Sequence, residues 1–279
     1  MVVAGVTRLS EFETMRADAP ALTPGAVHLW PLRVDAEAWP GIDWSSFLSE
    51  DEWDRARRFR YAGDAYRYTA SRALLRIVLA TYLRLDPRDL VFDYSTNGKP
   101  FLSRAGQLRF NLSHSHDAAL IGVTLAREIG VDVERIRDDL EVEQIARQFF
   151  SKAEQSALAT LPAIQRQGAF FDCWTRKEAF VKARGDGLSL PLDQFDVSVR
   201  PDEPACLVAT RPDAKEAAAW EAAAVAVEHG YAAAVVTQTG PVPLSYAVIE
   251  VTTLWLAALT PSAGSASRNE LWRSSFSIR

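Results

Sequence analysis

Cysteine is scarce in this sequence of 279 residues, and the sequence has no apolar run long enough for a membrane span. The two cysteines, Cys173 and Cys206, have no zinc-ligand spacing and suggest no disulfide framework, so a reducing cytoplasm is expected. The most apolar late run, residues 248–259, contains Glu250 and is too short to cross a bilayer. No Gly-x-x-x-x-Gly-Lys-Ser/Thr segment occurs, which argues against a P-loop nucleotide enzyme.

Positive charge is also in deficit. The 31 basic and 36 acidic residues give a formal net charge of -5, which argues against broad attraction to nucleic acid. Residues 1–11 lack a long apolar core and soon turn acidic, so they do not resemble a signal peptide. A hydrophobic content of 48% is ordinary for a globular protein with a sizeable core. We expect a cytoplasmic protein without a membrane or nucleic-acid partner.

The stretch Gly130-Val131-Asp132-Val133-Glu134 follows the apolar run 118–125. On a strand, its two valines face a core while both carboxylates project from the opposite face. Magnesium suits such a pair, because it takes one or two carboxylates and completes its shell with waters and phosphate oxygens. The alternative is a solvated strand face beside a turn.

Arginine is concentrated in two predicted helices. Ser49 and Glu52 form a capping box that predicts a helix to about residue 58, and a longer helix is predicted over 64–85. Their arginines are either a solvated, salt-bridged surface or a local anion site, for which phosphate is the favoured ligand. The set comprises Arg55, Arg57, Arg58, Arg60, Arg67, Arg72 and Arg76.

Residues 90–94 predict a strand, and Thr96-Asn97-Gly98-Lys99-Pro100 predicts a turn that is, taken alone, only a hairpin signal. Residues 110–116 then open the apolar strand 118–125. Within them, His114 is either a hydrogen-bond donor to an oxyanion, with Ser113 beside it, or a plain turn histidine. A metal role for His114 and His116 is disfavoured because no cysteine or third histidine stands at ligand spacing nearby.

A second capping box at Ser151 and Glu154 predicts a helix to about residue 161, and a longer helix is predicted over 165–184. In the longer helix, Glu178 and Lys182 are i and i+4 neighbours, as in an exposed ion pair, and Lys177 adds a second cation. Gly185-Asp186-Gly187 ends this helix.

The remaining strands are predicted over 26–35, 222–227 and 231–236, and Pro31 implies an edge position or a bulge in the first. The sequences of residues 85–93 and 190–197 are weakly similar. Each segment follows a predicted long helix and leads into a strand, which suggests two similar halves. Residues 261–267, rich in serine and small residues, predict a flexible tail.

Four motifs in order resemble those of the 4'-phosphopantetheinyl transferases of the larger, single-chain type that activate peptide and polyketide synthetases. The resemblance covers residues 27–236. Its motifs are Asn97-Gly98-Lys99-Pro100, the segment 110–115, Gly130 to Glu134, and the segment 174–182 closing in 185–188.

The resemblance implies an α+β fold made of a pseudo-twofold pair of similar α/β halves, with the active site in the cleft between them. The expected halves are residues 1–126 and 127–240, and residues 241–279 form an extension, partly flexible, to which no role is assigned. Because one chain supplies both halves, a monomer is expected.

The resemblance also implies the site residues. Asp132, Glu134 and Glu178 would bind Mg²⁺, with Mn²⁺ as a possible substitute, and Glu178 would accept the proton of the attacking serine. Lys177 and Lys182 would act in catalysis beside the phosphates and pantetheine arm of coenzyme A. The other expected contacts to coenzyme A are Arg55, Arg67, Asn97, Gly98, Lys99, Pro100, Ser113 and His114.

The implied reaction transfers 4'-phosphopantetheine from coenzyme A to a serine of an apo acyl or peptidyl carrier protein and releases 3',5'-adenosine bisphosphate. Two alternatives are a relative that binds without transfer and a different magnesium enzyme acting on a nucleotide. One departure is that Glu52 stands where a lysine of the phosphate clamp is expected, so this part of the clamp is either weaker or drawn from Arg58 or Arg60.

Overall fold

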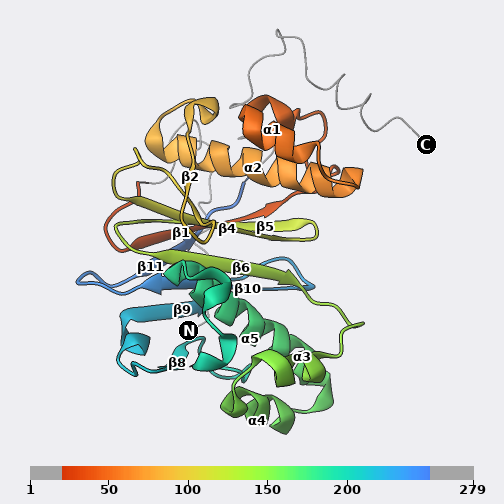
Figure 1. Ribbon diagram of the computed structural model, residues 1–279, viewed down its shortest axis with the longest axis vertical. Helices are drawn as coiled ribbons and strands as arrows, with labels where there is room; N and C mark the ends of the chain where they lie inside the picture. Colours follow the sequence, from red (N-terminus) through yellow and green to blue (C-terminus); the bar gives the residue numbers. More distant parts are fainter. Residues whose placement is uncertain (1–20, 252–279) are drawn as a thin grey trace.

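The computed structural model describes residues 21–251, which form four layers with helices outside and two sheets inside (Figure 1). The first sheet has the strand order β11-β1-β5-β4, in which β1 is antiparallel to β5 and parallel to β11. The second sheet is antiparallel with the order β6-β10-β9. Their strands are β1 Ala26–Arg33, β4 Leu108–Ser115, β5 Ala118–Leu125, β6 Ile129–Arg135, β9 Trp220–Ala224, β10 Tyr231–Gln238 and β11 Ser245–Val248.

Two small hairpins and five α-helices complete this part of the chain. The hairpins pair β2 (Asp93–Tyr94) with β3 (Pro100–Phe101), and β7 (Phe195–Val197) with β8 (Leu207–Thr210). The helices are α1 Glu50–Ala56, α2 Ala62–Leu83, α3 Val142–Phe149, α4 Lys152–Thr160 and α5 Ala163–Arg184.

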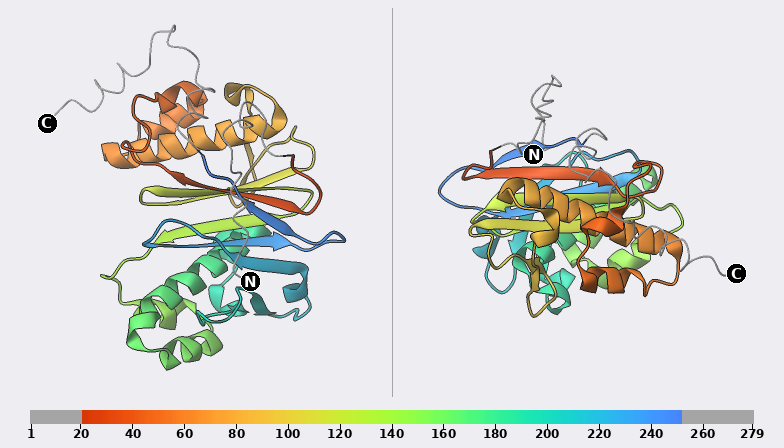
Figure 2. Two further views of the ribbon diagram at one scale, coloured as in Figure 1. Left: turned by 180° about the vertical axis from the view of Figure 1, so that it is seen from behind. Right: turned by 90° about the horizontal axis from the view of Figure 1, so that it is seen from above.

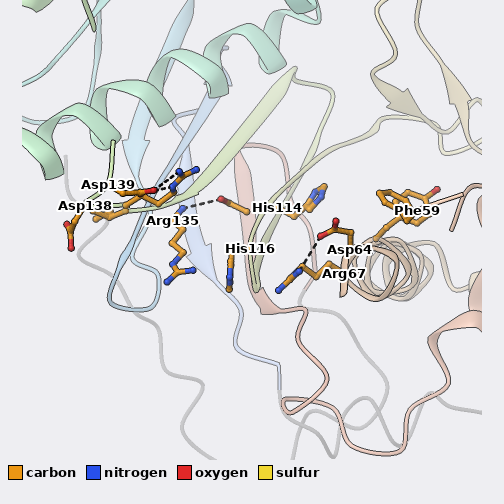
Figure 3. Close-up of a pocket in the computed structure, with 12 residues that line it drawn as sticks. Phe59, Asp64, Arg67, His114, His116, Arg135, Asp138 and Asp139 are labelled. Carbon is orange, nitrogen blue, oxygen red and sulfur yellow. Dashed lines mark hydrogen bonds and ion pairs between the residues drawn. The ribbon is translucent and has the colours of Figure 1, made fainter. Parts of the chain in front are cut away.

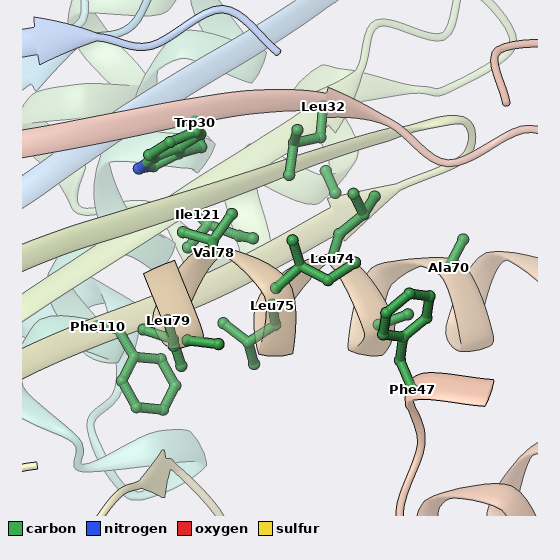
Figure 4. Close-up of a cluster of buried hydrophobic side chains, with 14 of the residues drawn as sticks. Trp30, Leu32, Phe47, Ala70, Leu74, Leu75, Val78, Leu79, Phe110 and Ile121 are labelled. Carbon is green, nitrogen blue, oxygen red and sulfur yellow. The ribbon is translucent and has the colours of Figure 1, made fainter. Parts of the chain in front are cut away.

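The 22-residue helix α2 covers the outer face of the first sheet. Its residues Leu74 and Val78 pack with Trp30 of β1 and Ile121 of β5 in one buried cluster (Figure 4). The helix α5 covers the outer face of the second sheet in the same way, through a cluster that includes Phe180 (Figure 2). Burial of such large apolar side chains is the main force that holds each helix on its sheet.

A third buried cluster fills the space between the two sheets. Val131 and Val133 of β6 are fully buried there with Leu29 and Leu120 of the first sheet. The prediction that these valines face a core is therefore confirmed, and the alternation of the strand sends Asp132 and Glu134 to the opposite face.

The predicted helices over 49–58, 64–85, 151–161 and 165–184 are confirmed within a few residues at their ends, and both capping boxes are formed. The strands predicted over 26–35, 222–227 and 231–236 are also present. Within the expected strand 90–94 only Asp93 and Tyr94 pair as β2, and residues 110–115 belong to a full strand of their own, β4. The fold class is α+β, as predicted.

One feature was not foreseen. Residues 241–279 were predicted as an extension, partly flexible, with no assigned role, and within them Ser245–Val248 form β11 and pair in parallel with Ala26 to Leu29 of β1. Pro31 follows the last residue of β1 that pairs with β11, so its missing N–H costs no ladder bond on that side. The predicted tail at 261–267 lies outside the described residues.

The two halves share a plan. Each has a capping-box helix, a 22-residue helix, and a short 3-10 turn that leads to a small strand. The change from one sheet to the other falls between Leu125 of β5 and Ile129 of β6. Within residues 21–251, none of the helices is long and apolar enough to cross a membrane.

Candidate active site

A glycine sets the distance between β6 and α5. A Cβ atom on Gly130 would lie 2.0 Å from the carbonyl oxygen of Ala179 and 2.3 Å from the amide nitrogen of Ala183. Strand and helix backbones are thus in direct contact, which only glycine permits. This contact places Asp132 on β6 beside Glu178 and Lys182 on α5.

We therefore expect Gly130→Ala to lower the free energy of unfolding by more than about 3 kcal/mol, because the added methyl group must push α5 off β6. Gly168→Ala is the matched control, since Gly168 lies in α5 with no atom within 4 Å of an added Cβ. That change should raise the free energy of unfolding by about 0.5–1 kcal/mol. Urea denaturation of both variants tests the pair, and equal stabilities would contradict the close contact.

Asp132 is the most buried carboxylate of the site, with 2% of the residue exposed. Its Oδ1 accepts hydrogen bonds from Lys182 Nζ (2.5 Å) and Ser113 Oγ (2.8 Å). Its Oδ2 is buried and has no hydrogen-bond partner among the described residues. A buried carboxylate oxygen without a partner is costly, so its presence in this site requires an explanation.

Glu134 and Glu178 lie close enough to Asp132 to interact with it electrostatically. Burial, followed by repulsion from Asp132, raises the pKa of Glu178. Burial also raises the pKa of Glu134, to which repulsion from Asp132 and Glu178 adds. Ser115 Oγ donates to Glu134 Oε2 (2.7 Å). Three mutually repelling carboxylates face a single lysine, Lys182.

These carboxylates fit a hard divalent cation in their chemistry, because oxygen ligands and an excess of negative charge are what Mg²⁺ requires. Among residues 21–251, no three histidine, cysteine, aspartate or glutamate side chains already converge on one metal position.

The edge of β4 lies against the edge of β6 and joins the halves through side chains. Val131 N donates to Asn111 Oδ1 (2.9 Å), and Ser113 and Ser115 donate to Asp132 and Glu134. Ser113 is 5% exposed and belongs to this seam, although the sequence placed it at the phosphates. The role of Ser115 was not recognised from the sequence. The sequence did contain a signal for it. Ser113 and Ser115 are two residues apart on one strand, as Asp132 and Glu134 are on another, so each pair shares one face of its strand.

A cavity of about 880 Å³ lies on one side of this seam (Figure 3). His114 and Arg67 line it from one half, and Arg135 and Arg137 line it from the other. Desolvation, together with the positive charges of Lys182 and Arg55, lowers the pKa of His114, so its ring is neutral at neutral pH. Arg135 and Arg137, which sequence reasoning did not select, bring two further guanidinium groups to this cavity. Asp64, Asp138 and Asp139 also line it, and Asp139 pairs with Arg137.

The exposed Arg55 lies over the ring of Tyr68, with its Cζ 5.3 Å from the ring centroid. Arg67 Nε donates to Asp117 Oδ1 (3.0 Å). Arg67 lines the cavity and is engaged by Asp117, whereas Arg55 lies against Tyr68, which also lines the cavity. An anion entering here would compete with Asp117 for Arg67.

A second cavity of about 640 Å³ opens further along the seam, where Asn111 and Leu112 of β4 line it. Glu178 and Lys182 line it together with the turn Asn97 to Pro100. Its remaining wall is largely apolar and includes Phe149 and Trp174. The seam thus borders a polar cavity and a more apolar one.

Lys177 does not join this site. It is fully buried, with Nζ 2.6 Å from Glu154 Oε1 and 2.7 Å from the carbonyl oxygen of Phe195. The lining of neither cavity, as formed by the described residues, includes Lys177. The expected contact of Lys177 with coenzyme A is therefore wrong. The physical reason is the helical step of 100° per residue, which turns Lys177 into the core while Glu178 faces the cleft.

Glu52, Arg72 and Arg76 form the counterpart of that buried pair in the other half. Glu52 is 2% exposed and accepts from the guanidinium groups of both arginines, with Arg76 Nε at 2.6 Å. Arg76 and Lys177 each lie fourteen residues after the first residue of their helices. Arg72 and Arg76 are thus internal ion-pair residues, and the predicted anion site does not extend to them.

The comparisons with known proteins identify the chain. A family model for the 4'-phosphopantetheinyl transferase superfamily matches residues 128–236, and one for the N-terminal part of 4'-phosphopantetheinyl transferases matches 42–126. The transferase HetI of Nostoc is 41% identical over 184 residues, covering 65% of this chain and 77% of that protein. This chain belongs to the 4'-phosphopantetheinyl transferase superfamily.

A second relative agrees with this assignment. The 4'-phosphopantetheinyl transferase Sfp of Bacillus subtilis is 35% identical over 157 residues, covering 56% of this chain and 69% of that protein. Among solved structures, a Thermotoga maritima holo-[acyl-carrier-protein] synthase aligns with a TM-score of 0.33 and 20% identity, over 40% of this chain and 62% of that one.

Proposed function

We propose that this transferase moves the 4'-phosphopantetheine group of coenzyme A to a serine hydroxyl of an apo carrier protein. The observation that carries the proposal is the buried, partnerless Oδ2 of Asp132 beside Glu134, Glu178 and Lys182, in a seam that borders two cavities. The named relatives HetI and Sfp, which are 4'-phosphopantetheinyl transferases, support the same reaction.

Asp132, Glu134 and Glu178 are the residues that would hold Mg²⁺, or Mn²⁺ in its place. When bound, the ion supplies positive charge to the phosphate oxygens of coenzyme A as negative charge builds up on them. The Lys182 ammonium group already neutralises part of the carboxylate charge, and it stands at the boundary with the second cavity.

The reaction forms a bond between the serine oxygen and the β-phosphorus, and breaks the bond from that phosphorus to the oxygen of 3',5'-adenosine bisphosphate. Glu178 accepts the serine proton, directly or through a water. Arg55 and Arg67 bind the 3'-phosphate, and His114, which lines the polar cavity with Arg67, lies near the phosphates. Such a reaction requires mainly positioning and charge neutralisation from the protein, which matches a site without a covalent nucleophile.

Intact-mass spectrometry tests this function. An apo carrier protein is incubated with the chain, coenzyme A and Mg²⁺, and a parallel sample contains EDTA. We expect the carrier to gain one phosphopantetheine group, and we expect the gain to disappear with EDTA and return with excess Mg²⁺. No gain with carriers from fatty-acid, polyketide and peptide systems would favour a relative that binds without transfer.

The remaining proposals concern the setting of the reaction. We infer a monomer that acts in the cytoplasm, with domains 1–126 and 127–240 that meet at the seam of β4 and β6. The single chain supports a monomer because it provides both sides of the seam by itself. Light scattering tests this, and a mass of twice 30.9 kDa would contradict it.

A further inference from the structure

The Lys99 side chain links the two halves at the end of the site. Its Nζ donates to Glu128 Oε2 (3.0 Å), to the carbonyl oxygen of Ile129 (3.2 Å) and to that of Ala183 (3.1 Å). The three donors of the ammonium group are all used in this way. Lys99 itself belongs to the β2–β3 turn of the first half. Of its partners, Glu128 directly precedes β6, Ile129 is the first residue of β6, and Ala183 lies at the end of α5.

The contact with Ala183 has a clear physical basis. Ala183 is in the last turn of α5, where carbonyl groups lack a partner within the helix. A cation at this end also interacts favourably with the helix dipole. Because only 18% of the Lys99 side chain is exposed, water screens these interactions little. Burial lowers the pKa of Lys99, while Glu128 favours its charged form.

Asn97, in the same turn, makes a second bond to this end of the helix. Its Nδ2 donates to the carbonyl oxygen of Gly185 (2.9 Å), the residue that caps α5 in a left-handed conformation. The turn is fixed internally, because Lys99 N donates to Ser95 Oγ and Gly98 adopts a φ of 81°. A rigid turn therefore holds the end of α5 through two side chains.

The residues that Lys99 contacts on β6 and α5 are close in sequence to the residues of the carboxylate cluster. Ile129 is three residues before Asp132 on β6, and Ala183 follows Lys182 on α5. We propose that Lys99 and Asn97 are positioning residues that fix the last turn of α5 against β6, and so hold Lys182 and Glu178 at Asp132. This inference rests on the proposed function for its catalytic consequence, but its structural part does not.

The proposal differs from the role that the resemblance implies for Lys99, which is a contact to coenzyme A. A ligand contact would strengthen binding of coenzyme A and leave the free protein unchanged. A positioning residue would act already in the free protein and would alter turnover more than binding, since small displacements of reacting groups slow a reaction strongly.

The test compares Lys99→Met, which removes all three bonds, with Lys99→Arg, Asn97→Ala and the control Lys215→Met. Lys215 is an exposed lysine at the start of a 3-10 turn, remote in sequence from the site motifs. Hydrogen–deuterium exchange of the free full-length protein is followed over residues 179–187. Calorimetry gives the dissociation constant of coenzyme A, and the mass assay gives kcat.

For Lys99→Met we expect exchange over residues 179–187 to be about tenfold faster than in the unmodified protein. We expect kcat to fall by about 10- to 100-fold, while the dissociation constant of coenzyme A changes by less than about threefold. Asn97→Ala should show smaller changes of the same sign, Lys99→Arg should recover part of the protection, and Lys215→Met should show no change.

Unchanged exchange with weaker coenzyme A binding would overturn the proposal and make Lys99 a ligand contact. Unchanged exchange with unchanged kcat would also overturn it. If Lys99→Met does not fold, Asn97→Ala decides by the same readouts. A lack of transfer by the unmodified protein would refute the proposed function, whereas the exchange comparison would still test the positioning role because it needs no turnover.

Discussion

Glu178→Gln is expected to lower the rate of carrier modification by at least about 100-fold, which is the range for loss of a general base. The loss should be larger if Glu178 also binds the metal, because one substitution then removes two functions. Single-turnover mass spectrometry with saturating coenzyme A and Mg²⁺ measures the effect. Glu37→Gln, which changes an exposed glutamate in a turn of the first half, is the control and should be fully active.

The stability of Glu178→Gln gives an independent readout. The pKa of Glu178 is raised in the folded protein by burial and by Asp132. A carboxyl group whose pKa is higher in the folded than in the unfolded state destabilises the fold at every pH above its unfolded pKa, where it should be ionised. Glutamine removes this charge, so the variant should be at least as stable as the unmodified protein at neutral pH. A variant with full turnover, or one that unfolds, would contradict the assignment.

The sequence predicted the local structure around the carboxylates because that structure depends on short-range patterns. Alternation placed Val131 and Val133 in a core and Asp132 on the other face, and the structure confirms this. The same reasoning missed α3, which is one short helix with only Val142 and Ala146 buried. Eight residues provide too few apolar positions to establish a helical period.

Pairing between distant segments was not predictable. β11 pairs with β1, although their paired residues are more than 200 positions apart in the chain. The segment is only four residues long, and its side chains are partly exposed, so nothing in its own pattern reveals the partner. The same limit applies to Lys99, whose contacts to Ile129 and Ala183 exist only once the halves have met.

Lys177 shows how a motif can mislead about function. It stands next to Glu178 in the sequence, and the family resemblance implied a position near the phosphates of coenzyme A. The sequence did show the capping box of Glu154, but it did not show that this carboxylate is buried and also accepts from Lys177 Nζ and Val197 N. The equivalent arrangement of Glu52 with Arg76 indicates that this buried acid–base pair belongs to the repeated plan of the halves.

Lys177→Met is therefore expected to lower the free energy of unfolding by about 3–5 kcal/mol, because it leaves the Glu154 carboxylate buried without its counter-ion. Arg57→Met is the control. Arg57 forms an exposed ion pair with Asp54, and its loss should change the free energy of unfolding by less than about 0.5 kcal/mol. Urea denaturation monitored by tryptophan fluorescence measures both variants.

The double variant Glu154→Gln with Lys177→Met separates a structural role from a catalytic one. With both charges removed, no ion remains unpaired in the core, so the double variant should lose clearly less stability than the sum of the two single variants. Measured where each variant is fully folded, the rate of transfer should stay within about tenfold of the unmodified protein, since no catalytic group has been removed. If Lys177 contacted the phosphates, the opposite pattern would result. Transfer would be lost in Lys177→Met and in the double variant, while the free energy of unfolding would stay close to that of the unmodified protein. The two patterns differ in both measured quantities, so one set of proteins decides whether this lysine acts on the substrate or supports the helix that carries Glu178.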